Sequence, residues 1–305
     1  MAYGRSLPWQ FSHQEKRDFL KGLGFISPWL LGFVLFMAYP IGASLYFSFT
    51  DYDILTAPKF VGLDNYRAML FEDEYLPKVL YNSVYYVILG VPAGLVTAFL
   101  LANLLNTNLR FRSLLRTVCY IPTVVPTVAS AMVWLWIFNS QYGVINSFLA
   151  SLGIRAIPFL SSQALVKPSL ILIHCWAAGG TMIIFLAALQ DVPRSLYEAA
   201  GVDGANGPQR FLNITIPMCT PAILFNLLTG MIGAFQYFTF AWILTQGGPN
   251  RASEFYALYL YRQAFVYLKM GYGSAMAWVL FVIVVVATIL LFRSSARWVY
   301  YAGQS

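Results

Sequence analysis

The sequence has few charged residues and few groups suited to catalysis. Only 10% of its 305 residues are charged, and it contains two histidines and three cysteines with no C-x-x-C pair. This pattern predicts neither a disulfide framework nor a metal site. The chain also lacks a G-x-x-x-x-G-K-[ST] phosphate loop and a segment that gathers acid, base and nucleophile. We therefore expect no catalytic residue, no metal site and no cofactor bound by this chain.

Apolar residues make up most of the chain. They account for 59% of it, and the mean hydropathy is +0.65, so a soluble domain of this size could not bury them all. The sequence predicts an all-α integral membrane protein with one transmembrane domain, 23–293, between polar ends, 1–22 and 294–305. Six segments have the length of a membrane helix: 23–49, 79–105, 117–138, 168–189, 218–245 and 271–292.

The basic residues indicate an orientation rather than a nucleic-acid partner. The net charge is +7, but the Lys and Arg residues are dispersed along the chain. Arg110, Arg112 and Arg116 share one short loop without an acidic residue, and such loops face the cytoplasm. We therefore expect both termini and residues 190–217 on the cytoplasmic side.

The six apolar segments contain no Asp, Glu, Lys or Arg. An ion-driven carrier usually keeps an ionisable residue at membrane depth. This absence counts against ion coupling, although a secondary carrier or half-carrier stays the alternative function.

Residues 190–217 form a polar island between two apolar segments. Ser195 and Glu198 fit a capping box that would begin a short helix, and Asp203-Gly204 would end it. So short a helix is not stable alone in water, so we expect it to pack against a partner.

This island resembles the EAA signature of binding-protein-dependent ABC importer permeases. The resemblance lies in Glu198, Ala199, Ala200, Gly201, Asp203, Gly204, Phe211, Ile214 and Ile216-Pro217. SFTDY at 48–52, FVGLDNY at 60–66 and LTQGGP at 244–249 are similar to the carbohydrate-importing branch, which includes the maltose and glycerol-phosphate permeases.

The resemblance implies a type I ABC importer permease in a prokaryotic inner membrane. In that family the signature is a coupling helix that sits in a groove of the ATP-binding subunit. The implied partners are a dimer of ABC ATPase subunits, which use ATP-Mg, a second permease that forms a heterodimer with this chain, and an extracytoplasmic solute-binding protein. The implied substrate is a carbohydrate or related polyol, and the subunit itself would not be an enzyme.

Candidate substrate residues lie in the fifth apolar segment. Aromatic faces and amides suit sugars, which have apolar faces and hydroxyl edges. At helical spacing Phe235, Phe238 and Trp242 share one face, although aromatic residues in membrane helices usually serve packing. The resemblance places Gln236 and Tyr237 on polar positions that line the sugar site. The candidates are Asn226, Phe235, Gln236, Tyr237 and Trp242.

Prolines and acidic residues mark two further features. We expect helix kinks at Pro122, Pro126, Pro217 and Pro221, which could transmit movement of the island to the helices. The first outer loop is either a solvated loop or a rim that meets an external partner. It contains Asp51, Asp53, Asp64, Glu72, Asp73 and Glu74.

Overall fold

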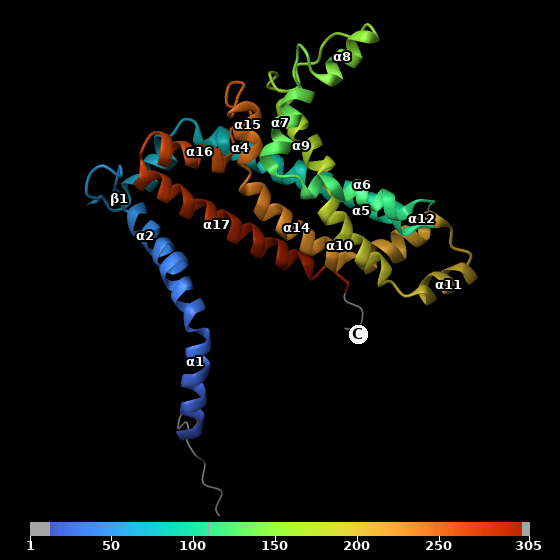
Figure 1. Cartoon of the computed structure of the whole chain (residues 1–305), viewed down its shortest axis with the longest axis horizontal. Coiled ribbons are helices and arrows are strands. Elements are labelled where there is room, and N and C mark those ends of the chain that lie inside the picture. Colours follow the sequence, from blue (N-terminus) through green and yellow to red (C-terminus); the bar gives the residue numbers. More distant parts are fainter. Residues whose placement is uncertain (1–12, 109, 301–305) are drawn as a thin grey trace, which may run out of the picture.

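The structure is a computed structural model that describes residues 13–108 and 110–300. Regular structure in these residues is nearly all helical, apart from a short antiparallel pair, β1 (Thr50–Asp51) and β2 (Lys59–Phe60). Figure 1 shows long helices running side by side, with β1 at one end of the molecule and α11 (Arg194–Val202) at the other. The expected all-α membrane fold is confirmed.

Three continuous helical stretches are long and apolar enough to cross a membrane. Two of them contain a π-helical turn just before a proline, Pro40 or Pro92, because proline has no N–H to close the regular helical hydrogen bond. Their parts are α1 (His13–Phe33), η1 (Val34–Ala38) and α2 (Tyr39–Ser48); α4 (Leu76–Tyr85), η2 (Tyr86–Gly90) and α5 (Val91–Asn106); and α17 (Met270–Ser295).

Three further candidate spans are bent pairs, which brings the total to as many as six in the described residues. The bends are 99° between α6 and α7, 50° between α9 and α10, and 63° between the α12–α13 segment and α14. The parts are α6 (Arg112–Val124), α7 (Thr127–Ile137), α9 (Val166–Trp176), α10 (Gly179–Gln190), α12 (Gly207–Arg210), η3 (Phe211–Thr215), α13 (Ile216–Met218) and α14 (Thr220–Phe235).

The kink expected at Pro126 is confirmed and is sharp enough to divide the segment 117–138 into two helices. Val125 and Pro126 both have extended backbone conformations. The residue before a proline is disfavoured in the helical conformation, so α6 ends there. Pro122, in contrast, lies inside α6 without a break.

Two asparagine side chains, the half-buried Asn65 and the buried Asn146, hold loops between the helices. Asn65 donates to the carbonyl oxygens of Ser48 and Thr50, at 3.0 and 2.8 Å. Asn146 donates to the Asn139 and Ile157 carbonyls and accepts from the Ile157 N–H. The short helices in these loops are α3 (Asp64–Phe71), α8 (Val144–Ser151), α15 (Thr239–Thr245), α16 (Tyr256–Tyr261) and η4 (Arg262–Val266).

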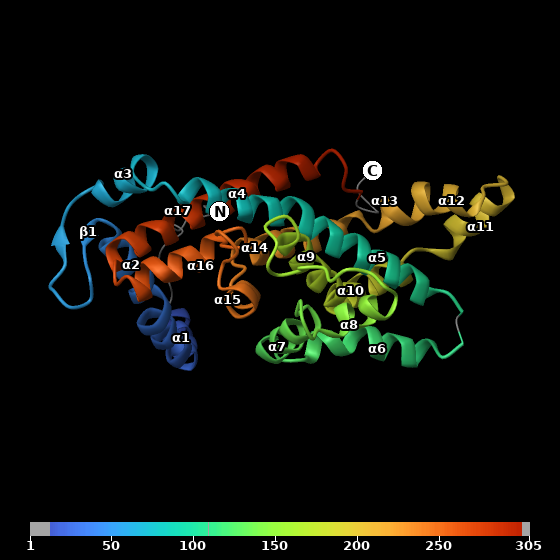
Figure 2. The same ribbon diagram turned by 90° about the horizontal axis from the view of Figure 1, so that it is seen from above.

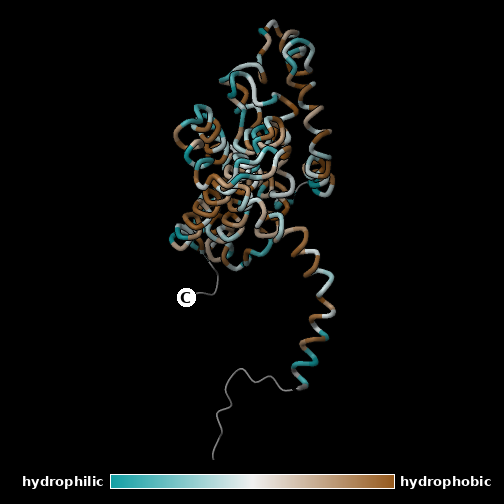
Figure 3. The backbone as a smooth tube through the Cα atoms, turned by 90° about the vertical axis from the view of Figure 1, so that its left-hand side faces the viewer, coloured by the Kyte–Doolittle hydropathy of each residue, from teal (hydrophilic) through white to brown (hydrophobic). Residues whose placement is uncertain are grey.

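The first span leaves the rest of the molecule. Its most hydrophobic window, within Lys16–Ser48, is 0% buried, although its α2 end packs against α17. Figure 3 shows α1 extending away from the body, hydrophobic over most of its length and hydrophilic at its free end. The described residues, 13–108 and 110–300, therefore leave most of α1 uncovered.

The helical core has three clusters of buried side chains. α5 packs along α10, and Figure 2 shows α10 between α5 and α6. Gly179 permits the close approach of α10 to α6, because a Cβ at that position would overlap the Cys119 carbonyl oxygen of α6. Phe99, Phe185 and Leu189 fill the cluster nearest α11. The rigid contact between these helices positions the segment that follows α10.

Candidate coupling and translocation sites

The polar island forms a helix, but its start differs from the expectation. Helix α11 begins at Arg194 after Pro193, and no side chain caps it. Ser195 therefore lies within the first turn, and the expected capping box of Ser195 and Glu198 is wrong. A capping box does form eleven residues later, where Asn206 and Gln209 bond reciprocally at the start of α12. Pro193 presets the backbone before α11, so the helix starts earlier than the serine signal predicts.

The end of α11 agrees with the expectation. Asp203 is the C-cap and Gly204 has a positive φ of 74°. The Gly204 N–H donates to the Gly201 carbonyl at 3.2 Å, and the Ala205 N–H donates to the Ala200 carbonyl at 2.9 Å. These two bonds make a Schellman motif, which glycine favours because it has no Cβ.

Few contacts attach α11 to the rest of the chain. None of its residues is buried. The Tyr197 hydroxyl lies 2.9 Å from the Thr215 hydroxyl, and Tyr197 packs against the cluster of Phe99 and Phe185. Leu196 and Val202 are 39% and 91% exposed. A nine-residue helix with so little packing needs a further contact surface to be stable.

The candidate coupling residues lie on α11 and on the turn that ends it. Ala200 is half-buried, and the other five are exposed. They are Glu198, Ala199, Gly201, Asp203 and Gly204. The expected placement of these residues on one short helix is therefore seen, while their role stays a prediction.

The candidate substrate segment is not one helix. Helix α14 ends at Phe235, Gln236 to Phe238 are non-helical, and α15 starts at Thr239. The expectation that Phe235, Phe238 and Trp242 share a helix face is therefore wrong. Phe238 and Trp242 still stack on each other, with ring centroids 6.1 Å apart, and both contact Tyr261.

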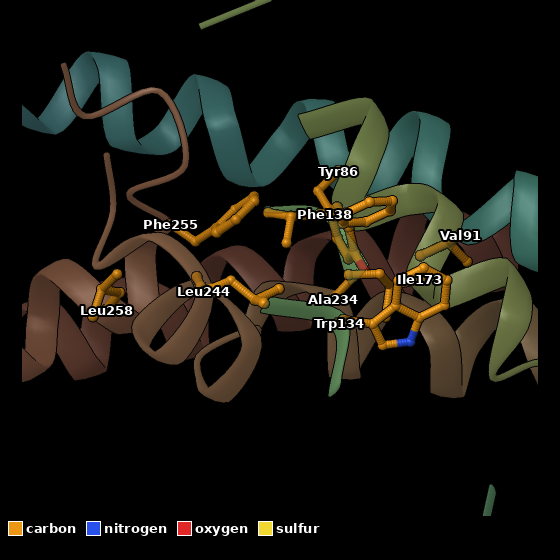
Figure 4. Close-up of a cluster of buried hydrophobic side chains, with 11 residues drawn as sticks. Tyr86, Val91, Trp134, Phe138, Ile173, Ala234, Leu244, Phe255 and Leu258 are labelled. Carbon is orange, nitrogen blue, oxygen red and sulfur yellow. The ribbon is translucent and has the colours of Figure 1, made fainter. Parts of the chain in front are cut away.

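The break lies against a buried aromatic cluster. Tyr237 contacts Tyr86 and Phe255, with ring centroids 4.4 and 5.1 Å apart. Figure 4 shows Tyr86, Phe255, Trp134 and their apolar neighbours in this cluster. The Tyr86 and Tyr237 hydroxyls and the Trp134 indole nitrogen are buried and have no hydrogen-bond partner in the described residues. Unpaired buried polar groups are costly. These three groups could form hydrogen bonds that are not made in the present conformation.

The structure separates the five candidate substrate residues. Phe235 is buried, and Asn226 is buried with its amide donating to the Ala222 carbonyl. Gln236 is exposed, Trp242 is half-buried, and the Tyr237 ring packs in the core with its hydroxyl buried. Of the five, Gln236 and Trp242 are therefore the most accessible to a solute.

The sequence reasoning missed Glu254. Its side chain is 0% exposed and pairs with Arg251 at 2.9 Å and Arg262 at 2.6 Å. Arg262 also donates to the Gln246 carbonyl, and Asn82 donates to the Glu254 carbonyl. This network ties the LTQGGP segment to α4. One sequence signal could have indicated these ion pairs: arginines stand three positions before Glu254 and eight positions after it.

The acidic outer loop is only partly solvated. Asp73 accepts from Tyr259 at 2.8 and 3.0 Å, from Tyr272, and from the N–H groups of Tyr75 and Leu76. Burial acts to raise the pKa of Asp73, but these hydrogen bonds outweigh it and lower the pKa below its usual value. Asp73 is therefore a structural carboxylate that joins the outer loop to α16 and α17.

The described residues offer no evident redox or metal chemistry. Residues 13–108 and 110–300 contain no group of three or more His, Cys, Asp or Glu that could hold a metal ion. His174 packs over Gly94 and beside Tyr86. What the geometry offers instead is an exposed helix at one end and a broken aromatic segment in the bundle.

Solved structures identify the architecture. A permease chain from a crystal structure of a bacterial ABC transporter involved in the import of the acidic polysaccharide alginate superposes with a TM-score of 0.82. It is 24% identical, and the match covers 92% of this chain and 96% of that one. The fold is that of an ABC importer permease.

Sequence comparison then gives the family. The chain belongs to the binding-protein-dependent transport system inner membrane components, whose family model matches residues 90–300. The family expected from the EAA-like island is therefore confirmed, and the chain is a multi-pass transport subunit of a membrane.

Individual relatives match over nearly their whole length. The probable ABC transporter permease protein YesP of Bacillus subtilis is 44% identical, with 96% of each chain covered. The sulfoquinovosyl glycerol permease SmoG of Agrobacterium fabrum is 32% identical, with 90% of each chain covered. The sn-glycerol-3-phosphate permease UgpA of Yersinia enterocolitica is 34% identical over 90% of this chain and 94% of its own.

Proposed function

We propose that this chain is a permease subunit of an ATP-driven importer for a carbohydrate or related polyol, and that α11 couples it to an ATPase subunit. The observation that carries the coupling role is the exposure of α11. This helix ends in a Schellman motif and has no buried residue. Its apolar side chains Leu196 and Val202 are exposed. A groove on a partner would supply the packing that this chain does not.

The proposed substrate class rests on relatives, on one exposed amide and on half-buried aromatic rings. SmoG and UgpA are named for sulfoquinovosyl glycerol and glycerol phosphate, and both substrates carry polyol hydroxyls. In this chain Gln236 offers an exposed amide, and Phe238 and Trp242 offer stacked, half-buried rings. Such rings suit the apolar face of a sugar.

A second permease is proposed from α1. The unburied window of the first span is apolar, and a neighbouring membrane subunit could pack against it. We propose a heterodimer of permeases, a solute-binding protein at the β1 end and two ATPase subunits at the α11 end. Arg110, Arg112 and Arg116 near the α11 end favour the cytoplasm for that end.

The proposed mechanism is alternating access. The partner ATPases bind and hydrolyse ATP-Mg, and closure of their dimer moves the two coupling helices together. In this chain the force passes from α11 through Tyr197 and Thr215 into the bent segment at α13 and α14. A bent, π-containing segment can change its angle at low cost, so movement of α11 could reorient α14 and the aromatic break beside it.

The test uses Gly204 in the complex purified through a tag on this chain and reconstituted in proteoliposomes. Gly204→Val forces a branched residue into φ 74°, which costs about 1–2 kcal/mol and disfavours the native turn by about 5–30-fold. We expect ATP-dependent uptake of labelled oligosaccharide to fall strongly while membrane insertion continues. Gly207→Val is the matched control, because Gly207 is exposed in a regular conformation with open space around it.

Uptake by Gly204→Val at the wild-type rate would contradict the coupling role. The energy source is tested separately in the wild-type complex. Uptake that survives ATP removal and collapses with an ionophore would instead indicate the secondary carrier.

A further inference from the structure

A basic cavity lies beside the start of α11. Its volume is about 530 Å³, which is within the usual range for a small-molecule site. It lies where α5 ends, α6 begins, α10 ends and α11 begins. It is lined by Asn106, Thr107, Asn108, Arg112, Leu189, Gln190, Val192, Arg194 and Tyr197.

Arg112 lines this cavity, and the guanidinium of Arg116 lies beside that of Arg112. Arg112 Nε donates to the Leu105 carbonyl at 2.7 Å, and an Arg116 terminal nitrogen lies 3.5 Å from the same oxygen. Terminal nitrogens of Arg116 and Arg112 also lie 3.2 and 3.3 Å from the Gln190 side-chain amide, whose oxygen accepts from both when it faces them. The Arg116 Nε is buried without a partner.

No carboxylate forms an ion pair with Arg112, Arg116 or Arg194 within the described residues. The cavity lining contains no Asp or Glu, and the ion pairs in 13–108 and 110–300 involve Lys21, Arg251 and Arg262 instead. Two like charges that share neutral acceptors repel each other, so an anion between them would be stabilised. The acceptors now in place are one carbonyl and one amide.

The helix ends add to the positive potential. α6 and α11 begin at the cavity with Arg112 and Arg194, and neither helix has an acidic residue in its first turn or a side-chain cap. The free N–H groups of a helix N-terminus favour negative charge. The cavity thus combines arginine forks, two uncapped N-termini and neutral amides.

We propose that this cavity binds a phosphate-bearing anion. A phosphate presents several oxygens to the planar donor fork of arginine, and Arg112 and Arg194 can approach it from two helices. The anion could be the headgroup of an acidic membrane lipid or a soluble phosphate. Leu104, Leu114 and Val118 expose an apolar surface on α5 and α6 near the cavity, where lipid chains would lie.

Such a ligand would connect the helix bundle to the coupling segment. Arg112 belongs to α6, and Arg194 belongs to the first turn of α11, which has few other contacts. A bound anion would therefore fix α11 relative to the bundle. Binding itself does not depend on the proposed transport function and can be measured without it.

The test measures binding to the full chain with two probes. Inorganic phosphate is titrated calorimetrically into protein in neutral detergent. In a second arm, native mass spectrometry counts phosphatidylglycerol retained from nanodiscs that also contain phosphatidylcholine. The variants are Arg112→Gln, Arg194→Gln and the double variant, and Arg110→Gln is the control with the same charge change in the same region.

We expect wild type and Arg110→Gln to bind one probe equally, and each cavity variant to bind it about tenfold or more weakly. Binding of phosphate identifies a soluble ligand, and retention of phosphatidylglycerol alone identifies a lipid. Failure of both probes to bind, or equal losses in Arg110→Gln and the cavity variants, would overturn the proposal. If the double variant misfolds, the binding measured for Arg194→Gln alone tests the proposal, because Arg194 is exposed.

Discussion

Glu254 gives the sharpest test of how the loop that contains LTQGGP is held. Its fully buried carboxylate is shared by Arg251 and Arg262. Glu254→Gln keeps nearly the same volume and removes the charge. Both arginines then lose their ionic partner, while the backbone bonds from Asn82 can remain.

The magnitude follows from burial. Removing one member of a buried ion pair costs about 3–5 kcal/mol. The side chains of Arg251 and Arg262 are 31% and 22% exposed, so water can reach them and the cost moves to the lower end, about 3 kcal/mol. For a chain of 305 residues, that corresponds to a fall of roughly 5 °C in the unfolding midpoint.

The assay is thermal unfolding of the purified chain in one detergent at fixed pH. Glu198→Gln is the matched control, because it makes the same chemical change at an exposed carboxylate on α11. Arg262→Gln and the double variant complete a mutant cycle. The coupling energy from that cycle isolates the pair from other effects of each substitution.

A small or unspecific shift of the unfolding midpoint would contradict a stabilising role for the buried pair. If Glu254→Gln lowered the midpoint no more than Glu198→Gln, the buried pair would not stabilise the loop. A coupling energy below about 0.5 kcal/mol between Glu254 and Arg262 would mean the same, because independent sites add within that margin.

Three other substitutions test separate contacts by the same unfolding assay. Gly271→Ala should cost about 1–3 kcal/mol or more, since its Cβ would overlap the Thr50 backbone carbonyl, and a wild-type midpoint would contradict that contact. Asn146→Ala should cost about 1–3 kcal/mol by leaving buried backbone groups unpaired; unchanged stability would mean that water replaces the amide. Asp73 has a lowered pKa, so its stabilising contribution is complete above its unfolded pKa of about 4 and is lost as pH falls through the folded value. Asp73→Asn should reduce this loss of stability at acid pH. An unchanged loss in the variant would mean that other carboxylates cause it.

Sequence reasoning located the spans well because hydropathy reports directly on contact with lipid. The expected segments 79–105 and 271–292 correspond to Leu76–Asn106 and Met270–Ser295. It also located the end of α11, because the positive φ of Gly204 is a local property of one residue. Signals of this kind need no knowledge of the rest of the fold.

The errors arose where distant contacts decide local structure. The segment 218–245 has no charged residue and is mostly apolar, so hydropathy could not reveal that the helix breaks at Gln236 to Phe238, where Tyr237 packs against Tyr86 and Phe255. The pairing of Glu254 with Arg262 depends on the fold of a loop, and no sequence periodicity predicts it. The role proposed for the α11 surface involves another molecule, which the sequence of this chain does not describe.

The isolation of α1 divides the effects of mutation along the chain. Substitutions within 16–38 that keep the segment apolar should leave the folding of the lone subunit unchanged, because the described residues bury none of the most hydrophobic window of this span. Their effects would instead appear as a wrong ratio of subunits in the proposed heterodimer. A saturation screen that measures folding and one that measures assembly should therefore differ most at residues 16–38.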